Sequence, residues 1–287
     1  MKGQSIRGYL LVERIKEGSV GPVWRVVDSK QQVFAIKQMS PKNAADPEKV
    51  RRFDKEASLT QKLAHPGILK VYERLDCDPP AFRMEYFESE NLKSALWNRS
   101  ERLLKHEFRI LRQVAEALDF VHGHGVVHKD IKPENVLVNR AAEARLIDFS
   151  LAQTRMDRLL QWGRRAEGTP LYMAPEQIRG EKCDARTDVY SFGVMTYELL
   201  TRRPPFLGTT PEALLDKHLK VPPPPLRTWV PTLSPDLEGL VLRMLAKKKE
   251  ERWPDMKAVL YELSKWEKKD TLVRVRQLGP MDPPRQK

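Results

Sequence analysis

The sequence predicts an α+β fold in which a small strand-rich N-terminal region precedes a larger, mostly helical C-terminal region. Three observations support this prediction. Residues 9–39 contain three runs of β-branched and aromatic residues separated by turns. Beyond about Asn91, apolar residues recur instead at helical spacing. The 287-residue chain, 40% hydrophobic and 31% charged, has the length and composition of a globular protein with a sizeable core.

One helix is predicted within the strand-rich region. Asp46 can accept hydrogen bonds at the helix start, and Pro47 suits the first helical position. The apolar stripe that follows ends at His65, which precedes a Pro-Gly turn. The predicted strands are Tyr9–Ile15, Val23–Val27, Val33–Met39, Ile68–Tyr72 and Phe82–Phe87.

The C-terminal region is predicted to be built on two main helices. Residues 107–122 carry apolar residues at helical spacing, and Val189–Leu200 is apolar nearly all round, which is typical of a buried helix. The proline run 222–225 predicts an extended loop, because proline cannot continue a helix. Residues from about Asp270 form a basic, proline-containing tail with no apparent core face.

Composition excludes several classes of protein. No segment approaches the roughly 20 apolar residues of a membrane span, and the N-terminus lacks a secretory signal. Cys77 and Cys183 lie far apart without metal-ligand spacing, which indicates a reducing compartment and a cytoplasmic protein. The net charge of +12 is spread over scattered lysines and arginines without a nucleic-acid-binding motif. We therefore expect a solvated basic surface and no nucleic-acid partner.

The most informative stretch is His128-Lys-Asp-Ile-Lys-Pro-Glu-Asn135. The carboxylate of Asp130 can orient an attacking hydroxyl and accept its proton. Lys132 can neutralise charge on a transferring phosphate, and the amide oxygen of Asn135 can bind a metal ion. Phosphoryl transfer depends on such positioning and charge neutralisation more than on covalent chemistry.

This stretch resembles the catalytic loop of the protein kinase superfamily, and the resemblance extends from the glycine loop to Arg252. Lysine two residues after Asp130 is typical of the serine/threonine kinases, and the sequence looks most like their bacterial branch. The resemblance implies a bilobal kinase fold, with ATP and Mg²⁺ as cofactors (Mn²⁺ as an alternative). It also implies a signalling protein that transfers the γ-phosphate to serine or threonine hydroxyls of protein substrates. The implied parts are an N-terminal lobe over residues 1–84, a hinge over 85–91, a C-terminal lobe over 92–269 and a basic tail over 270–287.

Three further residues correspond to the family's phosphate and metal groups. Lys37, in a strand that resembles the family's Val-Ala-Ile-Lys, is expected to contact the α and β phosphates and to pair with Glu56. Asp148 stands where the family has Asp-Phe-Gly and is expected to bind magnesium. Ser150 replaces the glycine of that motif. Glycine there permits positive φ and easy rearrangement, whereas serine pays a modest steric penalty in such conformations, so we expect Ser150 to affect loop mobility more than metal binding.

The nucleotide loop over residues 15–23 matches the family only in part. Gly18 and Gly21 are present, but Lys16 stands at the first glycine position, which predicts weakened ATP binding. The resemblance also places Ile15, Val23 and Ala35 in the nucleotide site. In the hinge, adenine is expected to bond the backbone at Glu85 and Phe87, with Met84 guarding the inner pocket.

The segment Gly168–Glu176 resembles the end of the family's activation segment. The resemblance implies that Thr169 forms hydrogen bonds in the neighbourhood of Asp130 and Lys132, and that the segment receives the substrate residue. Three architectural residues complete this region: Glu176 would form a buried ion pair with Arg252, and Asp188 would anchor the catalytic-loop backbone.

Two departures from the family bear on regulation. Lys129 replaces the arginine that usually grips a phosphate on the activation segment. No serine, threonine or tyrosine lies between Thr154 and Thr169, and the usual phosphate position falls near Arg165. Both observations predict that activity does not require phosphorylation of the central part of this segment.

Alternative functions are a pseudokinase that binds ATP as a scaffold, and a kinase of small molecules. Lys16, Lys129 and Ser150 motivate the pseudokinase, although none removes a group that touches the γ-phosphate in the family scheme. The protein-kinase-type segment over residues 168–176 argues against a small-molecule acceptor. The sequence carries no signal for oligomeric state.

Overall fold

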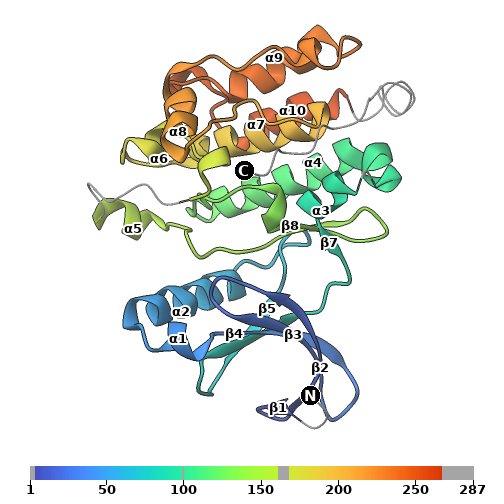
Figure 1. The fold of residues 1–287 in the computed structure, drawn as a ribbon, viewed down its shortest axis with the longest axis vertical. Helices are drawn as coiled ribbons and strands as arrows, with labels where there is room; N and C mark the ends of the chain where they lie inside the picture. The colour runs from blue at the N-terminus through green and yellow to red at the C-terminus, as the bar shows by residue number, and fades with distance from the viewer. Residues whose placement is uncertain (1–3, 99, 161–167, 267–287) are drawn as a thin grey trace. The chain divides into compact units, whose positions relative to one another are not determined.

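The computed structural model describes residues 4–98, 100–160 and 168–266 of the chain (Figure 1). The chain divides into two compact units. Unit 1 comprises residues 1–88 together with residues 147–150, and unit 2 comprises residues 89–146 and 151–287. Unit 2 therefore begins inside the predicted hinge, and the short segment containing Asp148 belongs with the N-terminal residues. The predicted basic tail and the position of Arg165 lie outside the described residues.

Unit 1 contains an antiparallel six-stranded sheet in the order β1-β2-β3-β4-β6-β5. β5 begins at Val71, later than predicted, because the N–H of Ile68 bonds the carbonyl of His65 in a turn. β6 ends at Glu85, two residues before the predicted end. The strands are β1 (Ser5–Ile6), β2 (Tyr9–Glu17), β3 (Pro22–Val27), β4 (Val33–Gln38), β5 (Val71–Leu75) and β6 (Ala81–Glu85).

The helix α2 (Pro47–Gln61) covers one face of this sheet and begins where the sequence predicts. Asp46 accepts hydrogen bonds from the N–H groups of Glu48 and Lys49, at 3.0 and 3.4 Å. Such a cap satisfies donors that have no partner within the helix. The ring of Phe53 packs on that of Phe82 from β6, with centroids 4.9 Å apart.

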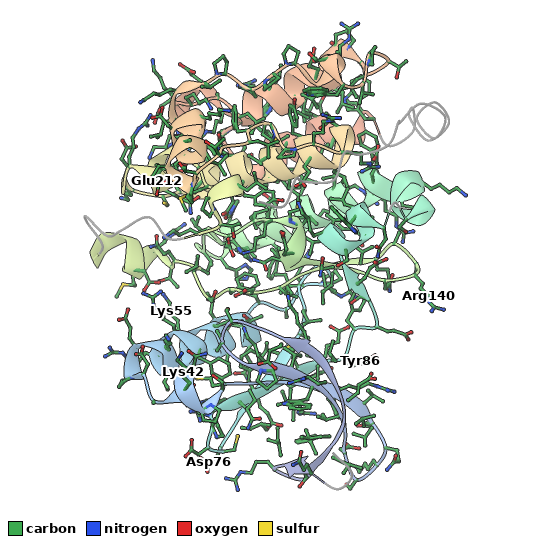
Figure 2. All side chains as sticks on the ribbon, in the orientation of Figure 1. Lys42, Lys55, Asp76, Tyr86, Arg140 and Glu212 are labelled. Atoms are coloured by element: carbon green, nitrogen blue, oxygen red, sulfur yellow. The ribbon has the colours of Figure 1, made fainter. Side chains whose placement is uncertain are left out.

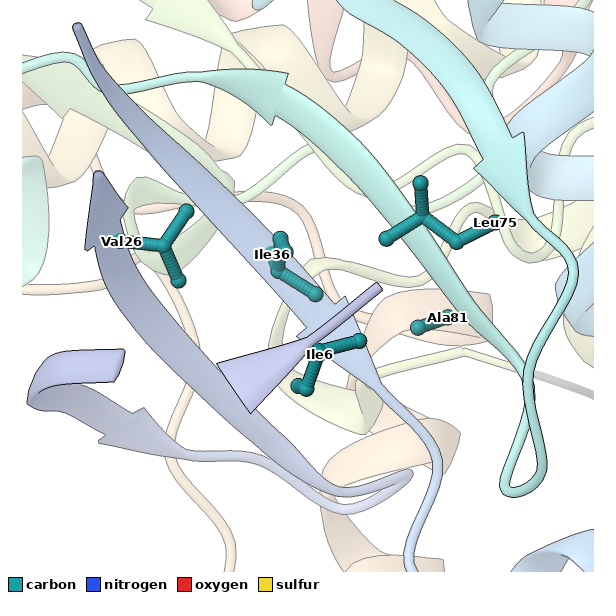
Figure 3. Packing of buried hydrophobic residues seen from close by; sticks show 5 residues of the cluster. All are labelled: Ile6, Val26, Ile36, Leu75 and Ala81. Carbon is teal, nitrogen blue, oxygen red and sulfur yellow. The ribbon is translucent and has the colours of Figure 1, made fainter. Parts of the chain in front are cut away.

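A second apolar cluster forms on the opposite face of the sheet (Figure 3). Successive side chains of a strand point to opposite faces, so Ile36 of β4 faces away from its neighbours Ala35 and Lys37. The short strand β1 covers this cluster with Ile6. The cluster consists of Ile6, Val26, Ile36, Leu75 and Ala81.

Unit 2 is mainly helical, as predicted. α4 (Glu101–Gly123) and α7 (Ala185–Thr201) include the two predicted helices and extend beyond them. α7 is buried along nearly its whole length and packs against α4 and α9. The other helices of four or more residues in the described part of unit 2 are α3 (Leu92–Trp97), α5 (Arg155–Leu160), α6 (Pro175–Ile178), α8 (Pro211–Lys220), α9 (Pro235–Met244) and α10 (Met256–Ser264).

Short elements carry the catalytic-loop region of unit 2. The 3₁₀ turn η1 (Pro133–Asn135) leads directly into β8 (Val136–Val138). β8 lies between β7 (Glu90–Asn91) and β9 (Ala144–Leu146) in a small antiparallel sheet. This sheet fixes the chain immediately after the catalytic loop.

Charged side chains of both signs project from the surface of each unit (Figure 2). Lys42 and Asp76 are exposed on unit 1, and Arg140 and Glu212 are exposed on unit 2. None of the helices in the described part of the chain combines the length and apolar character that a bilayer crossing requires.

Candidate functional site

The predicted catalytic loop forms a compact hydrogen-bonded network around Asp130 in unit 2. Lys132 Nζ lies 2.6 Å from Asp130 Oδ2 and 2.6 Å from the Thr169 hydroxyl oxygen. The Thr169 hydroxyl donates to Asp130 Oδ1 at 3.1 Å. Asn135 Nδ2 donates to Asp130 Oδ2 at 3.0 Å and to the Asp130 carbonyl at 2.9 Å. The predicted contacts of Thr169 with Asp130 and Lys132 are confirmed.

This network orients the Asp130 carboxylate while keeping it able to accept a proton. Each carboxylate oxygen offers two lone-pair positions. On Oδ2 these positions meet Lys132 and Asn135, whereas Oδ1 receives a single hydrogen bond from Thr169. Oδ1 is therefore the atom that can accept a hydrogen bond from a hydroxyl of another molecule.

The backbone of the loop is held by Asp188, the fourth residue of α7. Its carboxylate accepts from the N–H groups of His128 and Lys129, both at 2.8 Å, as predicted. Lys129 has a φ of 70°, an unfavourable value for a non-glycine residue. The Lys129 carbonyl accepts a hydrogen bond from Gln177 Nε2 at 2.9 Å. The bonds on both sides of Lys129 hold this strained conformation in place.

The burial and hydrogen bonds of Asp188 lead us to expect that the free energy of unfolding depends on pH. Burial favours the neutral Asp188 carboxyl and so raises its pKa. The hydrogen bond and charge of His122, whose Nε2 lies 2.8 Å away, have a larger effect in the opposite direction and lower this pKa below 3.8. A lowered folded-state pKa contributes stability that is complete above the unfolded-state pKa and is lost as pH falls through the folded-state value. We expect Asp188→Asn to reduce the acid-induced loss of unfolding free energy between about pH 5 and 3.

Urea unfolding at a series of pH values would measure this effect as a change in the slope of the unfolding free energy against pH. The exposed Asp216→Asn is the matched control and should keep the unmodified protein's slope. Equal slopes for Asp188→Asn and the unmodified protein would contradict the prediction.

Unit 1 brings together Lys37, Glu56 and Asp148. Lys37 Nζ lies 2.7 and 2.9 Å from the two oxygens of Glu56, so the predicted ion pair is formed. Burial opposes the charge of Lys37, but Glu56 and Asp148 outweigh it and raise the Lys37 pKa. Burial raises the Glu56 pKa, an effect that Lys37 opposes and Asp148 reinforces. The amine is thus kept as a cation beside two carboxylates.

Breaking this ion pair is expected to impair the use of ATP. Glu56→Gln removes the charge that orients Lys37, and hydrogen bonds to charged groups contribute about 1.5–3 kcal/mol. We expect kcat/KM for ATP to fall at least about tenfold. The control is Glu48→Gln, which removes an exposed glutamate of the same helix that pairs with Arg52. ATP kinetics unchanged by Glu56→Gln would contradict this role.

Several predicted nucleotide-binding residues share one face of the unit 1 sheet. Val23 is paired with Lys37, and Ala35 is paired with Met84, so these four side chains point to the same side. Ile15 lies on β2 and is 47% exposed. Glu85 donates its backbone N–H to the carbonyl of Lys70 at 2.8 Å, so the Glu85 carbonyl is the backbone group of this residue that is left for adenine.

The glycine loop has a structural reason for Gly21 that the sequence did not reveal. A Cβ at this position would lie 2.2 Å from the Gln38 carbonyl oxygen and 2.5 Å from the Ser40 nitrogen. Asn43, which the sequence analysis missed, donates from Nδ2 to the carbonyls of Ser19 and Val20 at 2.9 and 2.8 Å. No motif distinguishes Asn43 in the sequence, because its partners lie more than twenty residues away.

The effect of Ser150 on loop mobility stays a prediction, and in this conformation position 150 does not adopt the positive φ at which serine would pay a penalty. Positive φ occurs at Asp148, with a value of 66°, and Ser150 is not among the described residues with positive φ. The Ser150 N–H donates to Asp148 Oδ1 at 3.3 Å. Aspartate tolerates this left-handed region better than most residues, so the turn does not depend on glycine at position 150.

Each unit offers an oxygen group suited to a divalent cation. Asn135 uses its amide N–H groups on Asp130, so its Oδ1 remains as a ligand. Asp148 supplies a carboxylate in unit 1. The described residues contain no group of three or more His, Cys, Asp or Glu side chains that could hold a metal ion. Each of these oxygen groups is of a type that fits Mg²⁺, which is usually bound through one or two carboxylates together with substrate phosphates.

The predicted buried ion pair of the C-terminal region is also formed. The Arg252 guanidinium meets the Glu176 carboxylate through two parallel hydrogen bonds of 2.7 and 2.8 Å. Both side chains are almost fully buried. The pair connects the segment after Thr169 to the residues that precede α10.

The sequence model of the protein kinase domain matches residues 9–262, which is most of the chain. The chain belongs to the protein kinase family. A "Probable serine/threonine-protein kinase" of Streptomyces coelicolor is 33% identical over 254 residues, covering 85% of this chain and 38% of the relative. PknB of Mycobacterium tuberculosis is 34% identical over 226 residues, covering 76% and 36%. PknA of the same species is 33% identical over 246 residues, covering 83% and 56%.

These relatives are bacterial serine/threonine kinases, so the predicted resemblance to that branch and the predicted kinase fold are confirmed. This kinase chain matches between 36% and 56% of the length of those three relatives. The matched region of the kinase contains every site residue predicted from the sequence.

Proposed function

We propose that the chain is an active serine/threonine protein kinase that transfers the γ-phosphate of ATP to hydroxyls of protein substrates. The observation that carries this proposal is the network in which Lys132 and Thr169 both contact Asp130. In the reaction, the acceptor hydroxyl gives its proton to Asp130, and its oxygen bonds to the γ-phosphorus. The bond between that phosphorus and the β–γ bridging oxygen breaks, and ADP leaves.

The remaining residues are assigned supporting roles. Lys37, held by Glu56, binds the α and β phosphates, and Lys132 neutralises the transferring group. Asn135 and Asp148 would hold Mg²⁺, with Mn²⁺ as an alternative, and the cation supplies further charge neutralisation on the phosphates. The rest of the nucleotide site, which comprises the loop over the phosphates and the adenine pocket, is assigned to two groups of residues. These are Ile15, Gly18, Gly21, Val23 and Ala35 from the strands and glycine loop, and Met84, Glu85 and Phe87 from the hinge.

The deciding experiment is transfer of labelled γ-phosphate from ATP–Mg²⁺ to a generic acceptor protein. Phosphoserine or phosphothreonine formed by the unmodified chain, and absent with Asp130→Ala, would establish the activity. The same assay with Mn²⁺ would determine the cation preference. ATP binding without transfer would instead support a pseudokinase scaffold, for which Lys16 and Ser150 are the first residues to restore to glycine.

We also propose that activity does not require phosphorylation of the central activation segment. The absence of hydroxyl side chains between Thr154 and Thr169 supports this, as does Lys129 in place of an arginine. Phosphatase-treated protein is expected to transfer phosphate as fast as untreated protein from the first turnover. A lag that disappears after preincubation with ATP would contradict this.

A reducing compartment, and hence the cytoplasm, remains our proposal for where the kinase acts. Cys77 and Cys183 are both free thiols, which supports the proposal. Burial raises the pKa of Cys183 to about 11, so this thiol stays protonated and is chemically inert.

A further inference from the structure

Asn43, on the short helix α1 (Pro41–Ala44) of unit 1, uses both ends of its side-chain amide. Its Nδ2 donates to the carbonyl of Ser19 at 2.9 Å and to the carbonyl of Val20 at 2.8 Å. Its Oδ1 accepts a hydrogen bond from Lys49 Nζ at 3.0 Å, which keeps the NH₂ end turned toward the glycine loop. One side chain therefore holds two successive peptide groups of that loop.

The two carbonyls depend on Asn43 to different degrees. The Val20 carbonyl also accepts the backbone N–H of Ser40 at 3.0 Å. The Ser19 carbonyl has no hydrogen-bond donor other than Asn43 in the part of the chain that the structure describes. The orientation of the peptide group between Ser19 and Val20 is therefore set by the Asn43 side chain.

Holding these carbonyls also orients the N–H groups of the same peptide units. A trans peptide group is planar, and its C=O and N–H point in opposite directions. The Ser19 carbonyl shares its peptide group with the Val20 N–H, and the Val20 carbonyl shares its own with the Gly21 N–H. Both N–H groups therefore point away from Asn43. Neither donates a hydrogen bond to any of the described residues.

Such free backbone N–H groups are suited to phosphate oxygens. Successive N–H groups of a loop attract anions through their partial positive charge. If the peptide group between Ser19 and Val20 turned over, it would present its carbonyl oxygen in place of the N–H and would repel a phosphate. The hydrogen bond from Asn43 stabilises the orientation in which the N–H faces outward.

We propose that Asn43 is a positioning residue for ATP, which holds the N–H groups of Val20 and Gly21 ready to donate to the phosphate oxygens. The inference rests on the proposed kinase activity and concerns the phosphate end of the nucleotide alone. A loop that is already ordered loses less entropy when the nucleotide binds, so its affinity for phosphate is higher. Adenosine, which has no phosphate, should gain nothing from Asn43.

The backbone of Asn43 is fixed independently of its side-chain amide, so the side chain can be replaced without moving the helix. The Asn43 N–H donates to the hydroxyl oxygen of Ser40, which caps α1, at 3.3 Å. Asn43→Leu keeps about the same size, introduces no charge and removes the donor to the two loop carbonyls. It is therefore the variant that separates hydrogen bonding from packing.

The test measures the dissociation constants of adenosine and of ATP with Mg²⁺, and compares their ratio between variants. Asn43→Leu is expected to lower the ratio of the adenosine constant to the ATP constant at least about fivefold, through weaker binding of ATP. The adenosine constant should stay within about twofold of its original value, which also shows that unit 1 is folded. The matched control Gln61→Met removes another side-chain amide of unit 1, which donates to the Tyr72 carbonyl at 2.7 Å, and should leave the ratio unchanged.

Amide hydrogen exchange of the peptide that covers residues 18–21 provides a direct readout of the loop N–H groups. Saturating ATP is expected to slow exchange at Val20 and Gly21 in the unmodified chain, and to slow it less in Asn43→Leu. A purely structural role for Asn43 would not change the protection that bound ATP gives to these two amides.

If the unmodified chain binds ATP but transfers no phosphate, the proposed function fails, and the ratio of dissociation constants still tests Asn43. Equal weakening of ATP and adenosine binding by Asn43→Leu would show that Asn43 only stabilises the fold, and would overturn the inference. An unchanged ratio would overturn it too. So would an unmodified chain that binds ATP no more tightly than adenosine.

Discussion

Replacing Asp130 by asparagine is expected to lower kcat by about a thousandfold while leaving the fold intact, within the range of 10²–10⁴ for general acid–base catalysis. The amide cannot accept the proton of the substrate hydroxyl. Its oxygen can still receive the hydrogen bonds from Lys132 and Asn135, and its NH₂ group can donate to the Thr169 oxygen. The variant therefore removes the proton acceptor but keeps the network.

Single-turnover measurement of phosphate transfer at saturating ATP would separate the chemical step from binding. The dissociation constant of ATP should change little, because Asp130 is assigned to the acceptor hydroxyl. Asp216→Asn, on the exposed surface of α8, makes the same chemical change away from the site and should retain full activity. A loss of less than about tenfold for Asp130→Asn would mean that another group accepts the proton.

Replacing Arg252 by methionine is expected to lower the free energy of unfolding by about 3–5 kcal/mol, the typical cost of removing one partner of a buried ion pair. Glu176 would be left as an uncompensated buried carboxylate. Arg252 also donates to the carbonyls of Ala246 at 2.8 Å, Arg186 at 2.9 Å and Lys247 at 3.2 Å. These three acceptors would lose their partner as well.

Urea unfolding followed by circular dichroism would measure this loss. The double variant Glu176→Gln, Arg252→Met should recover part of it, because no unpaired charge then remains buried. As a control, Lys220→Met removes an exposed ion pair with Asp216 and should change stability by less than about 1 kcal/mol. A double variant no more stable than Arg252→Met would show that the loss comes from the carbonyl contacts.

The candidate site could be predicted from the sequence because its residues stand in short motifs. Asp130, Lys132 and Asn135 fall within six residues, and the order of side chains there already limits the reaction class. The helix start at Asp46 was equally predictable, since capping depends on neighbouring residues alone. The start of β5 was not predictable, because a turn at His65 shifts the start of the strand to a later residue. The hydrophobic pattern of the sequence does not indicate such a turn.

By itself, the sequence determined the α+β class and the separation of strands from helices, and it singled out the candidate catalytic groups. These properties follow from local spacing and from which face of an element is apolar. Only the tertiary structure decided which distant partners meet. Lys93 and Glu198 lie 105 positions apart, and Asn43 reaches back to a loop 23 and 24 residues earlier. Such contacts depend on how whole elements pack, and a periodic pattern specifies a buried face without specifying what covers it.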